Sequence, residues 1–175
     1  MGKMQSKIVL DGFCDSDWAN DPESRKSTTG FFVPCFGNHL KGRLLRPFTA
    51  KGLTLAGGAV SRMSRRQKTV VALSTVEAMY ISACEATMEE VAESNILQDV
   101  LPHKQVKLKL RIDNQAAHIL TNKTHRIAMA LCSTKGNHQF GKVKSNVNPA
   151  DVFMKALDKH HLQDDLKLIG IEDAK

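Results

Sequence analysis

The sequence predicts an α/β fold in which a mixed sheet is flanked by helices. The clearest strand lies over 106–112, where apolar residues alternate with basic ones. The clearest helix runs from Ser74 to about Val100, where apolar residues recur every three or four positions along one face. Three expected strands precede this helix, and the 106–112 strand follows it, an order typical of helices packed on a sheet.

The N-terminal part predicts a hairpin. Ile8–Phe13 is an apolar run that is expected to be a strand, with Asp15 just beyond its carboxyl end. A turn over 21–24 contains Asp, Pro and Ser, and Thr28–Val33 is rich in β-branched and aromatic residues. The two runs are therefore expected to pair.

The next segment has no clear period. Pro34–Leu55 contains several glycines and basic residues and is predicted to be a loop. Ala59–Ser61 follows two glycines and is predicted to be a third strand.

The C-terminal third is expected to be mostly helical. A short helix over Gln115–Leu120 should follow the 106–112 strand. Asn148 is a good N-cap with Pro149 at the first helical position, which predicts a helix through Leu157. A last helical piece is expected over 162–169.

Composition and charge favour a single domain that binds a polyanion. The chain has 175 residues with 42% hydrophobic content, which is enough for one core. Its 25 Lys and Arg against 18 Asp and Glu give a net charge of +7. This balance favours nucleic acid over an acidic substrate pocket or a neutral metabolite.

Two other protein classes are disfavoured. The four cysteines are far apart and form no Cys-x-x-Cys pair, so they indicate buried free thiols and neither a zinc site nor a redox site. The start lacks the apolar run of a signal peptide, and no segment has the roughly 20 apolar residues of a membrane span. An intracellular, non-membrane protein that is not secreted is expected.

Four carboxylates lie at the edges of apolar or helix-starting segments: Asp15, Glu77, Asp113 and Asp151. Magnesium is a hard cation that takes oxygen ligands. Phosphodiester hydrolysis at a two-metal site needs ions roughly 3.5–4 Å apart, which several carboxylates can hold. The pattern predicts a nuclease that depends on a divalent metal.

Five blocks of sequence, in their order along the chain, resemble the RNase H domain of copia-type retrotransposon Pol polyproteins. They are 15–19, 25–30, 68–78, 113–117 and 150–157. The resemblance implies an RNase H-like fold with a five-stranded mixed sheet. It also implies hydrolysis of the RNA strand of RNA/DNA hybrids during reverse transcription, with two Mg²⁺ ions or Mn²⁺ as a substitute.

The same resemblance implies the molecular context. A reverse transcriptase domain normally lies upstream in the same polyprotein. The expected location is the cytoplasm, in a virus-like particle, or the nucleus. The oligomeric state is left open.

The resemblance also assigns roles to the four carboxylates. Asp15 matches the first catalytic Asp, Glu77 the helix Glu, Asp113 the Asp of the Asp-Asn-Gln block, and Asp151 the last carboxylate. All four are expected metal ligands. Asp17 is a rival for the first role, but Asp15 is preferred because it directly follows the strand.

Structural interpretations of these carboxylates remain open. Ser74 and Glu77 fit a capping box, in which the Glu side chain reaches back to a backbone amide. Asp151 would be stabilised at a helix start whether or not it binds metal. Asp113 before Asn114 could begin a turn.

A basic run upstream of Glu77 and two polar residues after Asp113 are the candidate nucleic-acid contacts. They are Arg62, Arg65, Arg66, Lys68, Asn114 and Gln115. Lys and Arg at such positions hold phosphates without reading sequence. The alternative is an ordinary solvated surface.

The chain departs from the copia pattern in two places. Residues 34–54 are interpreted as an inserted loop. Residues 126–141 are interpreted as translated out of frame, because one permitted codon choice for 125–132, read one base later, gives the family's Ile-Glu-Leu-Arg-Trp-His-Phe block. The region before the last helix is then expected to be disrupted, with a strand or helix lost ahead of Asp151.

Two alternative functions remain. One is a catalytically inactive, degenerate remnant that at most binds nucleic acid. The other is a DNA nuclease of the integrase or transposase kind, against which the copia-like blocks argue.

Overall fold

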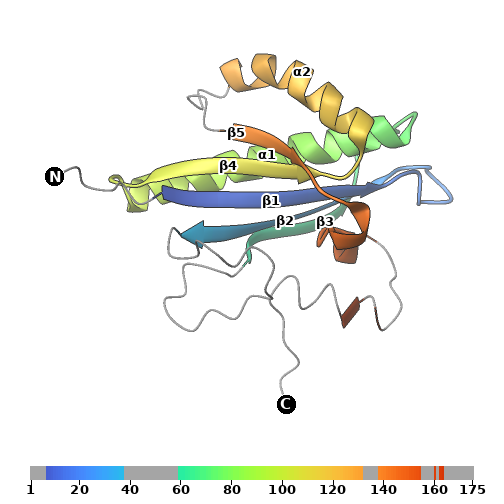
Figure 1. Ribbon diagram of the computed structural model, residues 1–175. Helices are drawn as coiled ribbons and strands as arrows, with labels where there is room; N and C mark the ends of the chain where they lie inside the picture. The colour runs from blue at the N-terminus through green and yellow to red at the C-terminus, as the bar shows by residue number, and fades with distance from the viewer. Residues whose placement is uncertain (1–6, 38–58, 132–137, 155–159, 161, 164–175) are drawn as a thin grey trace.

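A computed structural model describes residues 7–37, 59–131, 138–154, 160 and 162–163. Figure 1 shows the elements in chain order. They are β1 (Lys7–Asp17), β2 (Thr28–Gly37), β3 (Ala59–Arg66), α1 (Thr75–Val100), β4 (Gln105–Ile112), α2 (Gln115–Leu131), β5 (His138–Lys142) and two single 3₁₀ turns, η2 (Ser145–Val147) and η3 (Asp151–Phe153).

The five strands form one mixed sheet in the order β3-β2-β1-β4-β5. β1 pairs antiparallel with β2, and β2 pairs antiparallel with β3. β4 pairs parallel with both β1 and β5, so α1 and α2 serve as the crossover connections that parallel pairing requires. The predicted α/β architecture, a five-stranded mixed sheet flanked by helices, is confirmed.

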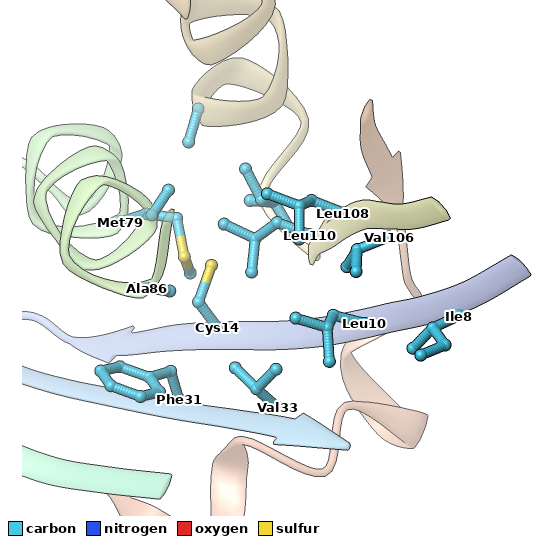
Figure 2. Packing of buried hydrophobic residues seen from close by; sticks show 13 residues of the cluster. Ile8, Leu10, Cys14, Phe31, Val33, Met79, Ala86, Val106, Leu108 and Leu110 are labelled. Atoms are coloured by element: carbon cyan, nitrogen blue, oxygen red, sulfur yellow. The ribbon is translucent and has the colours of Figure 1, made fainter. Parts of the chain in front are cut away.

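The core lies between α1 and the inner three strands (Figure 2). Alternate residues of β1, β2 and β4 point toward the helix, as the pleat of a strand requires. The fully buried or nearly buried members include Leu10, Cys14, Phe31, Val33, Met79, Ala83, Leu108 and Leu110. This packing fixes the position of α1 over the centre of the sheet.

The opposite face of the sheet is covered by the segment that contains η3. The rings of Phe32 and Phe153 stack with centroids 6.2 Å apart. Gly30 allows this approach, because a side chain there would collide with Met154 and with the Ala150 carbonyl. The Asn148 amide also donates to the Cys14 carbonyl at 3.1 Å, which ties this segment to β1.

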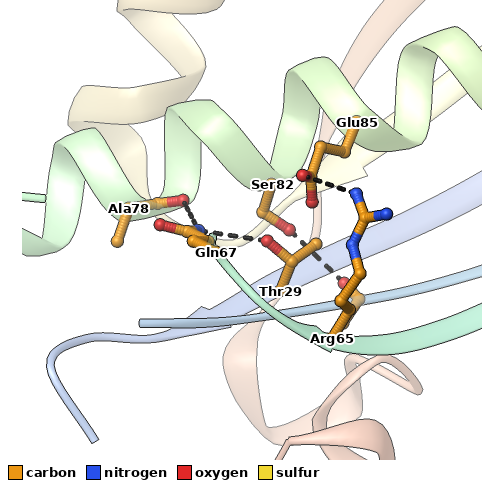
Figure 3. Close-up of polar contacts among 7 residues, drawn as sticks. Thr29, Arg65, Gln67, Ala78, Ser82 and Glu85 are labelled. Carbon is orange, nitrogen blue, oxygen red and sulfur yellow. Dashed lines mark hydrogen bonds and ion pairs between the residues drawn. The ribbon is translucent and has the colours of Figure 1, made fainter. Parts of the chain in front are cut away.

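Polar contacts attach the first half of α1 to the edge of the sheet (Figure 3). The Gln67 amide donates to the Thr29 hydroxyl and to the Ala78 carbonyl, both at 3.0 Å. The Ser82 hydroxyl donates to the Asp15 carbonyl at 2.7 Å. These contacts fix the position of α1 along its axis relative to the end of β1.

Four predicted element boundaries are corrected. β1 runs to Asp17, so Asp15 lies within the strand, paired with Gly30, and not beyond its end. Residues 34–37 continue β2 and are not loop, while 38–58 lie outside the described residues. β3 extends to Arg66, beyond the predicted Ala59–Ser61. α2 runs to Leu131, well past the predicted end at Leu120.

The expected loss of an element before Asp151 is wrong for the part that is described. Residues 126–131 complete α2, and 138–141 lie in β5, which pairs with β4 from His138 to Lys142. The intervening 132–137 lie outside the described residues. The segment interpreted as out of frame therefore contributes the fifth strand of the sheet.

The helix predicted from Pro149 is replaced, as far as it is described, by the single turn η3. Asn148 does not cap it, because the cap position is Ala150 and no side chain caps the turn. Residues 155–159, and 164–169 of the last predicted helical piece, lie outside the described residues. In the described part of the chain, no helix is long and apolar enough to cross a membrane.

Candidate active site

Asp15 and Asp113 come together where the parallel pairing of β1 and β4 ends. The last paired residues are Cys14 and Ile112, and each Asp is the next residue along its strand. Carboxyl ends of parallel strands are where ligands gather in open α/β sheets. The juxtaposition of Asp15 with Asp113 that the sequence pattern predicts is thus present.

These two carboxylates line an open depression of about 370 Å³. β1, the start of α1, the turn after β4 and η2 all contribute. The residues around it are Asp15, Ser16, Thr75, Met79, Asp113, Asn114 and Ser145. We call this depression the acidic pocket.

The acidic pocket carries buried negative charge. Asp15 is only 3% exposed, and its Oδ1 accepts from the Ser16 amide at 2.7 Å. Oδ1 of Asp113 is buried and has no hydrogen-bond partner among the described residues. A buried carboxylate oxygen without a donor is costly, so the arrangement favours the arrival of a cation.

The pKa of the neighbouring Cys14 thiol is shifted by burial and also by the carboxylates of the acidic pocket. Burial raises its pKa well above the usual value, and the carboxylates of Asp15, Glu90 and Asp113 raise it further. Negative charge concentrated in a partly desolvated recess attracts cations more strongly than the same charge on an open surface.

Glu77 does not line the acidic pocket. Ser74 caps α1 by accepting from the Glu77 amide at 3.2 Å, and the Glu77 carboxylate accepts from the Leu73 amide at 2.7 Å. The reach back to a backbone amide is therefore present, although the amide is that of Leu73, one residue before the cap.

Met79 is the α1 residue that reaches the acidic pocket beside Thr75. It is 4% exposed and points from α1 toward the strands (Figure 2). Sequence reasoning missed Met79, Thr75, Ser16 and Ser145 as lining residues. For Thr75 and Met79 the signal was their spacing of four, which places them on one face of a helix.

Asp151 and Asp17 are not among the residues that line the acidic pocket, although the Ala150 carbonyl lies against Gly30, which pairs with Asp15. Asp151 begins η3, on the segment that covers β2, and it does not line the acidic pocket. Asp17 ends β1, where it pairs with Thr28, and it is also absent from the lining. Of the two rivals for the first carboxylate, Asp15 is the one inside the pocket.

The basic run is divided between the two faces of the sheet. Arg65 lies on the α1 face, where it pairs with Glu85 at 2.9 Å. Strand alternation puts Arg62 and Arg66 on the other face, and Arg66 pairs with Asp21 at 3.2 Å. The side chains of Arg65 and Arg66 are about half exposed, at 52% and 57%.

Arg66 nevertheless belongs to the pocket's end of the sheet. Thr28 of β2 pairs with both Asp17 of β1 and Arg66 of β3. The backbone of Arg66 therefore lies two strand spacings, on the order of 10 Å, from that of Asp17. Lys68 follows β3 and is exposed.

The two polar candidates after β4 differ in their roles. Asn114 lines the acidic pocket and caps α2, since its side chain accepts from the Ala117 amide at 2.9 Å. Gln115 is exposed on the first turn of that helix.

The donor set is suited to a hard divalent cation but is not gathered into a closed cluster. Within the described ranges, no three His, Cys, Asp or Glu side chains stand close enough to hold an ion. Asp15 and Asp113 supply the oxygen ligands that Mg²⁺ prefers, and the partnerless Asp113 Oδ1 is available to it. The pair therefore fits a divalent cation held partly by water.

Comparison with known proteins gives the relationship. No protein-family model matches the chain. It is 29% identical over 177 residues to "Retrovirus-related Pol polyprotein from transposon TNT 1-94" of Nicotiana tabacum, a match that covers 95% of this chain and 12% of that protein. It is also 39% identical over 86 residues to "Secreted RxLR effector protein 161" of Plasmopara viticola, which covers 49% of this chain and 44% of that protein.

Among solved structures, the chain is similar to the Prototype Foamy Virus protease-reverse transcriptase, with 10% identity and a TM-score of 0.40. That match covers 100% of this chain and 22% of the other. The chain thus spans less than half the length of the proteins it matches. Its sequence match to the tobacco protein over 95% of its length makes it a relative of a retroelement Pol polyprotein.

Proposed function

We propose that this chain is an RNase H-like domain derived from a retrotransposon Pol protein, and that it hydrolyses the RNA strand of RNA/DNA hybrids. One observation carries the proposal. Asp15 and Asp113 lie side by side at the ends of two parallel strands, in an open pocket where one carboxylate oxygen has no donor.

Divalent magnesium suits this pair because it takes carboxylate oxygens and retains much of its water. Bound Mg²⁺ supplies the activation of water and the stabilisation of the leaving oxygen in phosphodiester hydrolysis. Asp15 and Asp113 are the residues that would hold it, with Mn²⁺ as a substitute.

The remaining rim of the acidic pocket is polar and suited to a nucleic-acid backbone. Ser16, Thr75 and Ser145 offer hydroxyl groups, and Asn114 offers an amide. Such groups hydrogen-bond phosphate oxygens and the ribose 2′-hydroxyl, which distinguishes RNA from DNA. Their function is to orient the RNA strand beside the carboxylates.

Affinity for the hybrid comes from charge outside the pocket. The chain carries a net charge of +7, and Arg62, Arg66 and Lys68 are exposed. These groups contact phosphates without reading sequence. Because the tobacco relative is far longer than this chain, we expect a reverse transcriptase domain of the same polyprotein to supply further contacts.

A second candidate function is a remnant that binds nucleic acid without cutting it. The observation that favours it is the position of Glu77 and Asp151, whose carboxylates do not line the acidic pocket. Such a chain would bind hybrid through its basic groups and show no metal-dependent cleavage.

The test is cleavage of an RNA/DNA hybrid labelled on the RNA strand, with Mg²⁺ or Mn²⁺, by the wild type and by Asp113→Asn. We expect cleavage by the wild type and a loss of at least about 10–100-fold in the variant, because a ligand of the ion is weakened and even the outer partners of metal ligands are worth that much. Asp17→Asn is the matched control and should cleave as the wild type does.

Two results would contradict the proposal. One is a folded wild type that binds the hybrid but leaves it intact with either ion, which would favour the remnant. The other is cleavage of a labelled DNA duplex in preference to the hybrid, which would favour a nuclease of the integrase kind.

A further inference from the structure

We propose that position 79, and not position 77, is where α1 meets the acidic pocket, and that Met79 limits this pocket to two carboxylates. The chain would then bind divalent cations weakly, and a carboxylate at position 79 would complete the site. The inference deepens the proposed function and rests on it for the identity of the ion.

Positions 77 and 79 lie on different sides of α1. Residues two apart on an α-helix point in directions about 200° apart, so they cannot both face one pocket. Thr75 and Met79 share a face and both line the acidic pocket. Ser82, one turn further on, fixes this face against the end of β1 through its 2.7 Å bond to the Asp15 carbonyl.

Glu77 is occupied on another side of the helix. Its carboxylate accepts from the Leu73 amide at 2.7 Å and its own amide donates to the Ser74 hydroxyl at 3.2 Å. Turning this side chain to the pocket would give up one of the contacts that start the helix. Glu77 is therefore a structural residue of the α1 N-terminus.

Met79 brings a thioether to a site that needs oxygen. The sulfur is soft and is a poor ligand for Mg²⁺, which selects carboxylates, carbonyls and water. The side chain is nearly buried, so it also removes water from one wall of the pocket. Two carboxylates and water ligands remain, an arrangement that holds the ion less tightly than three carboxylates do.

Met and Glu are both unbranched and of similar length. Met79→Glu would place carboxylate oxygens where the thioether now lies, beside Asp15 and Asp113. Without metal, three neighbouring carboxylates repel one another. A divalent cation relieves this repulsion, so the variant should depend on the ion for stability.

The test is calorimetric titration with Mg²⁺ and thermal unfolding with and without Mg²⁺ for the wild type, Met79→Glu and Met79→Gln. We expect Met79→Glu to bind Mg²⁺ roughly tenfold or more tightly than the wild type. It should also show the largest rise in Tm on addition of the ion. Met79→Gln, which has the same shape without the charge, should show a smaller rise.

Glu77→Gln is measured in parallel, so that the inference can still be tested if the added charge keeps Met79→Glu from folding without metal. Mg²⁺ affinity is expected to be unchanged in Glu77→Gln. Loss of Mg²⁺ binding in that variant, or a folded Met79→Glu with no gain in affinity, would overturn the inference.

Failure of the inference is distinguishable from failure of the proposed function. Tighter Mg²⁺ binding by Met79→Glu without cleavage of the hybrid would support position 79 and contradict the nuclease. Cleavage by the wild type that is lost in Glu77→Gln would support the nuclease and contradict position 79.

Discussion

At the scale of single residues, Gly12 determines how closely β1 approaches α1. Its amide donates to the buried Glu90 carboxylate at 3.1 Å. A Cβ atom at this position would collide with that carboxylate and lie 3.1 Å from a methyl carbon of Leu110. The strand and the helix can pack at this distance only because residue 12 has no side chain.

We predict that Gly12→Ala lowers the free energy of unfolding by about 1–3 kcal/mol, because the added methyl group overpacks the interface. The measurement is urea-induced unfolding followed by circular dichroism. Gly141→Ala is the matched control, since a Cβ atom there would lie 3.2 Å from the Cε atom of Lys109 and in ordinary contact, at 3.8 Å, with the Cγ atom of Arg111. Equal losses in the two variants would contradict the close approach at Gly12.

The acidic pocket was predictable in part from individual residues. Asp15 and Asp113 each follow the last residue of the parallel pairing between β1 and β4, so their meeting could be predicted from the rule for parallel strands. The local pattern of residues around Glu77 matches a family block, which predicts a metal ligand there. The same pattern is also a helix start, and only the phase of the completed helix shows that Met79 faces the pocket.

At the scale of elements, a buried polar pair joins α1 to β5. Glu90 Oε2 lies 2.9 Å from His138 Nε2, and both side chains are almost fully buried. Burial raises the pKa of Glu90 well above its usual value. The hydrogen bond from the Gly12 amide lowers this pKa, but by less than burial raises it. Burial also lowers the pKa of His138 to about 4. Both shifts favour the neutral form of the group concerned.

These two shifts act on stability in opposite directions. A His with a lowered pKa destabilises the fold as pH falls from about 6.5 to about 4, because only the unfolded chain gains the proton. A Glu with a raised pKa destabilises the fold as pH rises above about 4.5, because the unfolded chain ionises first. Replacing Glu90 isolates the second effect.

We predict that Glu90→Gln becomes more stable relative to the wild type as pH rises from 5 to 8. The gain is at most about 1.4 kcal/mol for each pH unit below the folded pKa of Glu90. Urea unfolding at several pH values measures it, with the exposed Asp99→Asn as control. Parallel stability curves for Glu90→Gln and the wild type would show that Glu90 is not protonated in the fold.

The elements themselves were predictable where local pattern and packing agree. α1 and β4 have strong periodicity and appear almost as predicted. β5 has the sequence His-Gln-Phe-Gly-Lys, which contains no β-branched residue, and it is a strand because β4 pairs with it. Tertiary context of this kind cannot be obtained from a local pattern.

At the scale of the whole molecule, a net positive charge surrounds a local cluster of negative charge in the acidic pocket. The chain as a whole is basic, with a net charge of +7 and a pI near 9.3. The acidic pocket is a local exception at one end of the sheet. This arrangement suits the proposed function, in which a polyanion would bind along the surface and the carboxylates would hold a cation beside one of its phosphates.

We predict that hybrid binding weakens steeply with salt, measured by fluorescence anisotropy in EDTA so that cleavage does not interfere. The double variant Arg62→Ala/Lys68→Ala should reduce the slope of log affinity against log salt by about 0.9 for each contact removed. Lys107→Ala is the control, because Lys107 pairs with Val9, away from the pocket end of β1. An unchanged slope in the double variant would remove this surface from the proposed interface.

The central claim is that Asp15 and Asp113 form the metal-dependent centre of a nuclease. The most direct measurement is the single-turnover rate of RNA-strand cleavage in a labelled hybrid, compared between the wild type with Mg²⁺, the wild type with EDTA, and Asp113→Asn with Mg²⁺. The account predicts cleavage only in the first of these. Equal cleavage by Asp113→Asn, or an intact hybrid bound to folded wild type with Mg²⁺ and with Mn²⁺, would contradict it.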